Sequence, residues 1–213
     1  MCVIRPFLSS LFFAVLIWTG YGSPDFFQDL PRSILFVSSL PAIYVLMLRQ
    51  GGVKKGKERG ESDSFFLFLI ASTVAAGFFI PFFSGKGITG LHLPPFLRYA
   101  GVALFLAGLF LRWIAIRALK QQFSIFVAIQ ENHQLVTTGI YSRIRHPIYL
   151  GAVMSLLGFV LVFPTLLGFI FMLIYSMLLG HRMTQEEKLM LKHFGSVYEE
   201  YTMKSYRLIP HIY

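Results

Sequence analysis

A short polar segment near the middle of this sequence carries side chains that can bind an anion or move a proton. It contains Arg143, Arg145, His146, Pro147 and Tyr149. Pro147 fixes its own φ and keeps His146 out of the α region, so a helix is expected to begin here. Free backbone N–H groups and the dipole at such a helix start favour an anion. The alternative is a membrane-boundary turn whose positive charge only sets topology.

A second polar segment follows about thirty-five residues later. Arg182 and Glu186 are four residues apart, so on a helix they share one face. On their own they predict no more than a surface ion pair. The apolar run after His146 and the one that ends at Gly180 are expected to form an antiparallel hairpin. The hairpin brings His146 and Tyr149 beside Arg182 and Glu186, which makes this group a candidate site.

The elements that must position these groups are apolar. Of the 213 residues, 55% are hydrophobic, 23 are Phe and only 14% are charged, with a mean hydropathy of +0.65. A soluble domain of this size could not cover itself with so little polar surface. We expect an all-α integral membrane protein, a polytopic helical bundle of about six spans. The apolar runs are 7–18, 33–48, 64–83, 96–119, 147–163 and 165–180.

Positive charge predicts the orientation of these spans. If the basic loop 49–63 is cytoplasmic, helix alternation places both ends of the hairpin on that side as well. All nineteen Lys and Arg are then cytoplasmic except Arg32, Lys86, Arg98 and Arg112. The net charge of +9 therefore indicates topology rather than a nucleic-acid partner. The first apolar run is interpreted as an uncleaved helix, because no good signal-peptidase site follows it.

The chain divides at the fourth span. Residues 1–111 are expected to form N-terminal transmembrane helices with a basic cytoplasmic loop. Residues 112–213 are expected to form a region with an interfacial segment, the hairpin and cytoplasmic helices. Segment 119–138 is too polar to span, although 123–127 could be a short extended piece. The second hairpin helix has no breaker after Gly180 and is expected to continue to Phe194, with Gly195 ending it and a short helix at 196–203.

Several chemistries find no support. Residues 85–90 match G-x-G-x-x-G, but no strand–helix context surrounds them, so a glycine-rich turn is expected. No His and carboxylate spacing suits a metal, no G-x-S-x-G is present, and the single Cys2 is remote. Arg112 lies inside the fourth span, where it either extends to the interface or reaches a ligand headgroup.

The order and spacing of residues in the C-terminal half carry a resemblance. The pattern comprises His133-x-Leu135-Val136, Gly139-x-Tyr141, Arg145-His146-Pro147-x-Tyr149-x-Gly151, Glu186-Glu187-x-x-x-Leu191-x-x-Phe194-Gly195-x-x-Tyr198-x-x-Tyr201 and Pro210. It resembles the isoprenylcysteine carboxyl methyltransferases, and the related membrane phospholipid methyltransferases share much of it. The resemblance covers the chain from about Arg112 onward.

The resemblance implies an S-adenosylmethionine site on the cytoplasmic side, enclosed by the C-terminal segment. By that analogy Arg182 and Glu186 engage the methyl acceptor. The residues that would line the cofactor pocket are His133, Leu135, Val136, Tyr141, His146, Pro147 and Tyr149. The lipid part of the acceptor would enter from the bilayer between the fourth span and the hairpin.

The expected function is carboxyl O-methylation of a prenylated cysteine or a similar lipidated acid. A carboxylate acceptor needs no general base, whereas an amine acceptor needs one from Glu186 or His146. The alternatives are N-methylation of a phospholipid headgroup, a non-catalytic membrane lipid-binding protein, and a reductase of the sterol type that binds a nicotinamide nucleotide. The expected partners are a lipidic or prenylated acceptor and membrane lipids.

Overall fold

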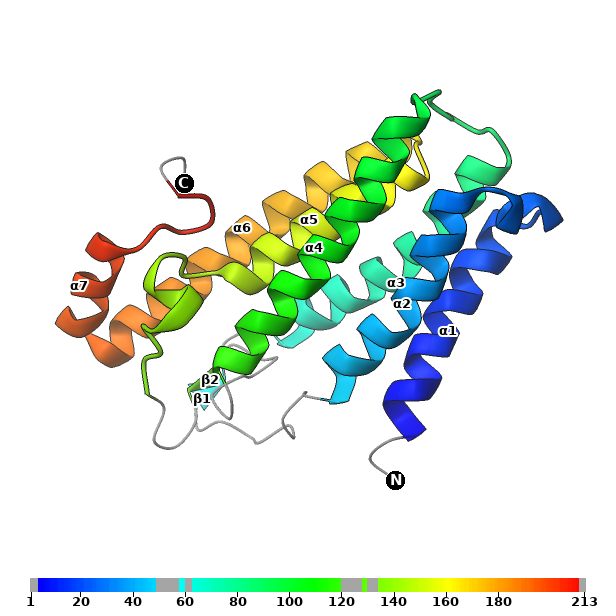
Figure 1. The fold of residues 1–213 in the computed structure, drawn as a ribbon. Helices are drawn as coiled ribbons and strands as arrows, with labels where there is room; N and C mark the ends of the chain where they lie inside the picture. Colours follow the sequence, from blue (N-terminus) through cyan, green and yellow to red (C-terminus); the bar gives the residue numbers. More distant parts are fainter. Residues whose placement is uncertain (1–3, 49–57, 60–62, 120–127, 130–133, 211–213) are drawn as a thin grey trace.

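The computed structural model describes the backbone of residues 4–48, 58–59, 63–119, 128–129 and 134–210, and the side chains of 11–39, 71–119 and 134–210. Almost all of the described chain is helical (Figure 1). The helices are α1 (Ile4–Tyr21), η1 (Pro24–Gln28), α2 (Leu30–Leu48), α3 (Asp63–Gly85), α4 (Pro95–Leu119), η3 (Gly139–Ser142), α5 (Pro147–Val162), α6 (Leu166–Phe194) and α7 (Ser196–Lys204). The all-α prediction is confirmed.

Helices α1 to α6 run alternately up and down, so successive connections lie at opposite ends of the bundle (Figure 1). At one end, β1 (Glu58–Arg59) pairs antiparallel with β2 (Ala128–Ile129) and joins the α2–α3 and α4–α5 connections. At the other end, the amide of Leu166 donates to the carbonyl of Thr89 at 3.0 Å. The alternation expected from the positive charges is therefore the arrangement of the helices.

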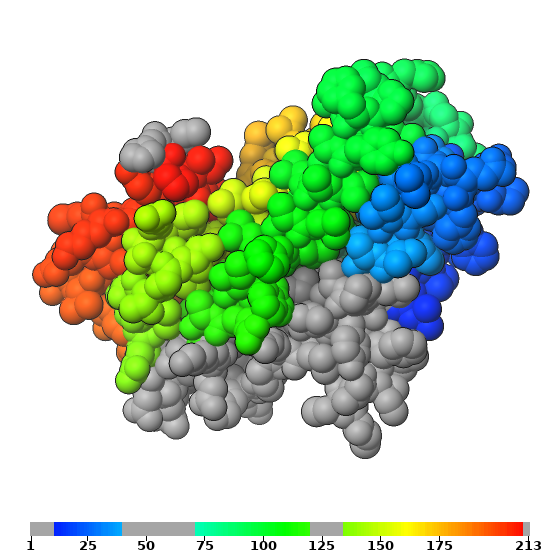
Figure 2. Space-filling view, in the orientation of Figure 1, coloured from blue at the N-terminus to red at the C-terminus, as the bar shows by residue number. Residues whose placement is uncertain are grey.

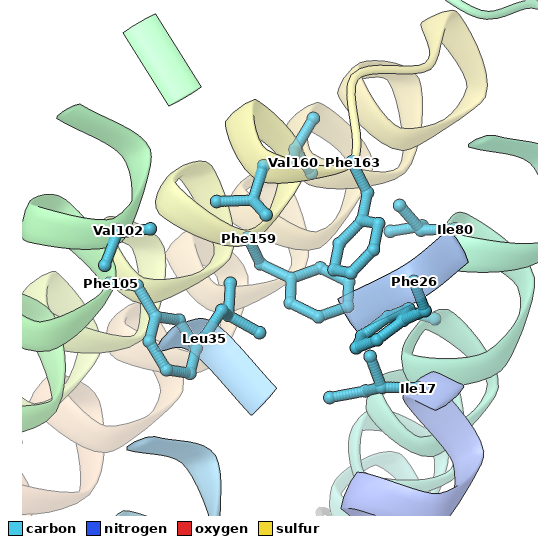
Figure 3. Packing of buried hydrophobic residues seen from close by; sticks show 11 residues of the cluster. Ile17, Phe26, Leu35, Ile80, Val102, Phe105, Phe159, Val160 and Phe163 are labelled. Atoms are coloured by element: carbon cyan, nitrogen blue, oxygen red, sulfur yellow. The ribbon is translucent and has the colours of Figure 1, made fainter. Parts of the chain in front are cut away.

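The apolar core joins α1, η1, α2 and α3 to α4 and α5 (Figure 3). Phe26 of η1 and Phe163 after α5 are both fully buried, and their ring centroids lie 6.2 Å apart. Ile17 of α1 and Leu35 of α2 are also fully buried in this cluster. Close packing of this kind holds helices together where lipid offers no hydrophobic driving force.

Helices α4 and α5 approach to backbone contact along a line of small residues. A Cβ added to Gly108 would lie 2.5 Å from the carbonyl oxygen of Gly151, and one added to Gly151 would lie 2.6 Å from that of Gly108. The hydroxyl of Ser155, on the same face, donates to the carbonyl of Phe105 at 3.3 Å. Such a seam leaves no room for a lipid chain. The predicted access between the fourth span and the hairpin is therefore wrong where α5 meets α4.

The hairpin follows the prediction closely. Thr165 caps α6 by accepting from the amide of Gly168 at 3.0 Å. The helix then runs without interruption to Phe194, and Gly195 ends it with φ +54. The third apolar run, expected over 64–83, is helix α3, which continues through Pro81 to Gly85. A membrane helix tolerates such a proline when neighbouring groups satisfy the freed carbonyl.

Two described helices, α4 and α6, are long and apolar enough to cross a membrane. Shorter apolar stretches are Leu11–Tyr21, Ala71–Gly85 and Pro147–Val162. About six spans therefore remains a prediction. The glycine-rich motif is a turn after α3, with Gly87 at φ +66 and Thr89 at φ +53. Since a helix precedes it, it is not a dinucleotide-binding loop.

Candidate functional site

The start of α5 has the predicted geometry. His146 is the N-cap residue and Pro147 occupies the first turn. The carbonyl of His146 accepts from the amides of Tyr149 and Leu150, both at 3.1 Å. The imidazole is 9% exposed. We call the turn into α5 at His146 and Pro147 the α5 corner. It holds a buried histidine at a helix N-terminus, shortly after η3.

The extension of α6 beyond Gly180 meets this corner. Arg182 is 4% exposed, and its Nε donates to the Tyr149 hydroxyl at 2.8 Å and to Glu186 Oε1 at 3.3 Å. The Tyr149 hydroxyl in turn donates to Glu186 Oε1. His146 Nδ1 lies 3.7 Å from Glu186 Oε2. The predicted meeting of His146, Tyr149, Arg182 and Glu186 is confirmed.

Glu187 is the residue that most extends the predicted group. Its Oε1 lies 3.0 Å from Arg145 Nε and 3.1 Å from His146 Nε2, and its Oε2 lies 3.1 Å from Arg207 Nε. Arg207 also donates to the hydroxyl of Thr184 at 2.6 Å. One carboxylate therefore joins the α5 corner, α6 and the C-terminal segment. The sequence pattern contains Glu187 but predicts no role for it, because the i,i+4 spacing from Arg182 favours its neighbour Glu186.

The segment after α7 lies along the residues before α5. The amide of Arg145 donates to the carbonyl of Tyr206 at 2.8 Å, and the amide of Tyr206 donates to that of Arg143 at 2.8 Å. The Arg145 guanidinium also donates to the carbonyls of Thr202, at 3.1 Å, and Ser205. Figure 2 shows the C-terminal segment in red against the yellow-green residues that precede α5. The prediction that the C-terminal segment encloses the corner rested on resemblance alone, and these contacts support it.

We name the charged and polar side chains of this region the site cluster. Its members are Arg145, His146, Tyr149, Arg182, Glu186, Glu187 and Arg207. Arg207 was missed by sequence reasoning. No spacing rule connects it to Glu187, because α6 ends and the whole of α7 intervenes between the two residues.

Burial changes the chemistry of the tyrosines around the cluster. It raises the pKa of Tyr201 to about 12, and it raises the pKa of Tyr141 and of Tyr198 well above the ordinary range. Their hydroxyls therefore stay protonated and act as donors. Tyr201 donates to the carbonyl of Tyr141 at 2.6 Å. The hydroxyl of Tyr141 is itself buried and has no hydrogen-bond partner in the described chain, which suits a ligand contact.

The other predicted pocket residues are less well defined. Leu135 and Val136 are half-buried in the segment that leads into η3. His133 lies outside the described residues. Arg112 on α4 packs against Gly151, two residues after Tyr149, and its Nε is buried without an acceptor in the described part of the chain. Such burial favours a role inside the bundle over extension to the interface.

A groove of about 250 Å³ lies between α6 and α7, beside the site cluster. Its lining residues are Thr184, Glu187, Lys188, Leu191, Tyr198, Glu199 and Thr202. Tyr141 lies in η3, and His146, Pro147 and Tyr149 lie at the start of α5, so this groove adjoins rather than coincides with these predicted pocket residues. Among residues with described side chains, no group of three His, Cys, Asp or Glu could hold a metal ion.

Comparison with known proteins finds relatives for this part of the chain. Residues 101–192 match the sequence model of the isoprenylcysteine carboxyl methyltransferase (ICMT) family. A protein-S-isoprenylcysteine O-methyltransferase of Schizosaccharomyces pombe is 35% identical over 140 residues, covering 59% of this chain and 58% of that protein. A probable protein-S-isoprenylcysteine O-methyltransferase of Oryza sativa is 29% identical over 120 residues, covering 55% of this chain and 63% of that protein.

A relative with another activity also matches. A Delta(14)-sterol reductase of Mus musculus is 34% identical over 83 residues, covering 38% of this chain and 20% of the reductase. The chain spans less than two thirds of the length of each of these curated relatives.

The fold has a solved counterpart. The structure of the eukaryotic intramembrane Ras methyltransferase ICMT matches with a TM-score of 0.54 at 20% identity, covering 99% of this chain and 87% of that one. The likeness includes the N-terminal helices, which lie outside the family match. With the apolar helices α4 and α6, it supports the predicted fold of a membrane-spanning helical bundle.

Proposed function

We propose that the protein transfers a methyl group from S-adenosylmethionine to the carboxylate of a prenylated cysteine or a similar lipidated acid, because residues 101–192 match the sequence model of the isoprenylcysteine carboxyl methyltransferase family. The observation that carries the proposal is the buried Arg182, held by Tyr149 and Glu186 where the hairpin helices meet. A buried guanidinium whose Nε is held by two partners is suited to hold a carboxylate.

The division of labour follows from these contacts. Arg182 binds the acceptor carboxylate and prevents it from rotating away from the donor. Glu186 and Tyr149 are positioning residues, because they fix the Arg182 guanidinium from one side. No general base is needed, since the acceptor is already an anion. Alignment and exclusion of water are then the main contributions of the protein.

The cofactor would be held by the corner of α5. S-adenosylmethionine supplies a methyl group already activated by its sulfonium. The proposed contacts are His133, Leu135, Val136, Tyr141, His146, Pro147 and Tyr149. The buried hydroxyl of Tyr141 fits such a group, because it offers a protonated donor with no partner among the described residues.

The acceptor chain requires access from the bilayer. Since α4 and α5 are in backbone contact, we propose that the lipid arrives alongside α6. Helix α6 packs less extensively on its neighbours than α4 does on α5. Ile174 and Met177, on the stretch of α6 before Arg182, are 52% and 73% exposed, so this part of α6 presents an uncovered apolar surface. We further propose that the site faces the cytoplasm, as the distribution of positive charge favours.

The test is product identification with purified protein, labelled donor, and either farnesyl-cysteine analogues or a phospholipid extract. A labelled methyl ester that alkali releases from the farnesyl-cysteine analogue supports the proposal. An alkali-stable methylamine on phospholipid would instead establish headgroup N-methylation.

Two further outcomes would overturn methyl transfer itself. Calorimetry that detects no donor binding would favour a non-catalytic lipid-binding protein. Binding of a nicotinamide nucleotide in place of the donor would favour a reductase, the activity named for the mouse relative. Arg182→Ala and His146→Ala separate the two halves of the site, since only the second is expected to weaken donor binding.

A further inference from the structure

The end of the bundle opposite the site cluster holds a second group of charges, which we name the opposite-end cluster: Asp29, Arg32 and Arg98. Both terminal nitrogens of Arg98 donate to the carboxylate of Asp29, each at 2.6 Å. Asp29 also caps α2 by accepting from the amide of Arg32 at 3.1 Å. The carboxylate is therefore fully engaged by Arg98 and by the start of α2.

The side chain of Arg32 remains as a surplus cation. Its Nε lies 3.7 Å from Asp29 Oδ1, beyond hydrogen-bond distance, and has no acceptor within the described residues. The guanidinium lies 4.3 Å from the ring centroid of Tyr21, which supports a cation without neutralising it. The described groups that act on its charge are Tyr21, Asp29 and Arg98. Two guanidinium groups therefore share one carboxylate, and one positive charge is uncompensated.

The surroundings of Arg32 resemble a lipid boundary. Trp18, Phe27 and Leu30, from α1, η1 and α2, are 46%, 51% and 56% exposed. The rings of Trp18 and Phe27 are in contact, with centroids 6.4 Å apart. Aromatic residues next to a charge are typical of the depth at which lipid headgroups begin. The Arg32 side chain is 17% exposed, so part of it is accessible from outside the protein.

We propose that Arg32 binds a phosphate group at this end of the bundle. Phosphate matches the planar fork of a guanidinium and supplies the missing negative charge. The apolar rim formed by Trp18, Phe27 and Leu30 suits the chains of a phospholipid, whereas free phosphate would make no use of it. The site is separate from the proposed methyl transfer, because Arg32 lies outside residues 101–192 and its neighbour Arg98 donates to the carbonyl of Val162, at the end of α5 away from His146.

The experiment measures the thermal unfolding of the purified chain in detergent against three additives. These are a short-chain phosphatidylglycerol, a diacylglycerol with the same chains, and inorganic phosphate. The phospholipid is expected to raise the unfolding temperature of the wild type, and the diacylglycerol is not. Arg32→Gln is expected to shift the half-saturating phospholipid concentration upward roughly tenfold, the effect of one charge-assisted hydrogen bond.

Lys86→Gln is the matched control, because it removes an exposed cation from the same end. It should leave the half-saturating concentration unchanged. An equal response to inorganic phosphate, lost in Arg32→Gln, would assign the site to free phosphate. The same half-saturating concentration in wild type and Arg32→Gln would overturn the proposal. If Arg32→Gln does not fold, Arg32→Lys decides: weaker phospholipid binding supports the site and unchanged binding refutes it. Donor binding by these variants shows whether the proposed function stands independently.

Discussion

The charged clusters at the two ends of the bundle are connected in different ways. In the site cluster, Glu187 is shared by Arg145, His146 and Arg207, and Glu186 by Tyr149 and Arg182. In the opposite-end cluster, one carboxylate is held by two short bonds from a single guanidinium.

The difference concerns what each cluster can do. A carboxylate shared by several donors can lose one partner and keep its charge compensated, so a ligand can replace a partner at small cost. A carboxylate that is bound in a bidentate pair by a single guanidinium has no second partner of this kind, so removing that guanidinium leaves it without compensation. The shared cluster includes residues of the family-matched region, whereas Asp29, Arg32 and Arg98 all lie before residue 101. The comparison predicts catalytic sensitivity at one end and structural sensitivity at the other.

The largest expected effect is at the site end. Arg182→Ala should lower the rate of methyl transfer roughly a thousandfold, because it removes the proposed acceptor-binding cation. Arg182→Lys should recover little, since an ammonium lacks the planar fork held by Tyr149 and Glu186. The measurement is the initial rate with a farnesyl-cysteine analogue, with donor affinity by calorimetry as the control. Lost donor affinity with an unchanged rate per bound donor would reverse the assigned roles.

The α4–α5 seam connects the two ends, so a change there should disturb both. Gly108→Ala places a methyl group 2.5 Å from the carbonyl of Gly151 and is expected to cost about 3 kcal/mol of unfolding free energy. Gly180→Ala is the matched control, because a Cβ there meets nothing within 4 Å. It should be neutral or slightly stabilising. Chemical denaturation in detergent compares the two variants. If Gly108→Ala were as stable as Gly180→Ala, α4 and α5 would be shown to move apart without a cost in unfolding free energy.

The opposite end is expected to contribute stability and not catalysis. Asp29→Asn leaves Arg32 and Arg98 without a counter-charge and removes about 2–3 kcal/mol of unfolding free energy, since the pair is mostly buried. For a chain of this size that is a fall in unfolding temperature of roughly 5–10 °C. Donor binding at temperatures where the variant is folded should equal that of the wild type. A loss of donor binding there would show that the two ends are coupled.

Most of the fold was accessible from the sequence. Hydrophobic run lengths located the helices, Pro147 fixed the start of α5, and Gly195 fixed the end of α6. Pro81 does not end α3, because a membrane helix can absorb a proline that would end a soluble helix. The lipid path was misjudged at the α4–α5 seam. Its closeness depends on glycines of two helices facing each other, which a single helix pattern does not reveal.

The candidate site was predictable in part, for a related reason. Arg182 and Glu186 share a face at i,i+4 spacing, and the hairpin brings His146 and Tyr149 to them, so local rules sufficed. Arg207 lies beyond α7, and so does Ser205, whose carbonyl Arg145 binds. No helical periodicity relates these positions to the α5 corner. Asp29 and Arg98 meet across sixty-nine positions of sequence. Pairs of that kind depend on packing angles that composition does not encode.

The smallest expected effect concerns the contact that ties α7 to η3. Tyr201→Phe removes the hydrogen bond to the carbonyl of Tyr141 and should cost about 1 kcal/mol of unfolding free energy. Burial raises the pKa of Tyr201 to about 12, above the ordinary value near 10, so the folded state holds this proton more tightly than the unfolded state. The contribution is therefore complete below about pH 10 and declines as the pH rises toward 12.

Tyr99→Phe, at an exposed position on α4, is the control. The difference between the two variants should be constant from neutral pH to about pH 9 and shrink above pH 10, measured by denaturant unfolding at each pH. A difference that grows with alkalinity would mean that the hydroxyl is ionised in the folded protein and that α7 is held in another way.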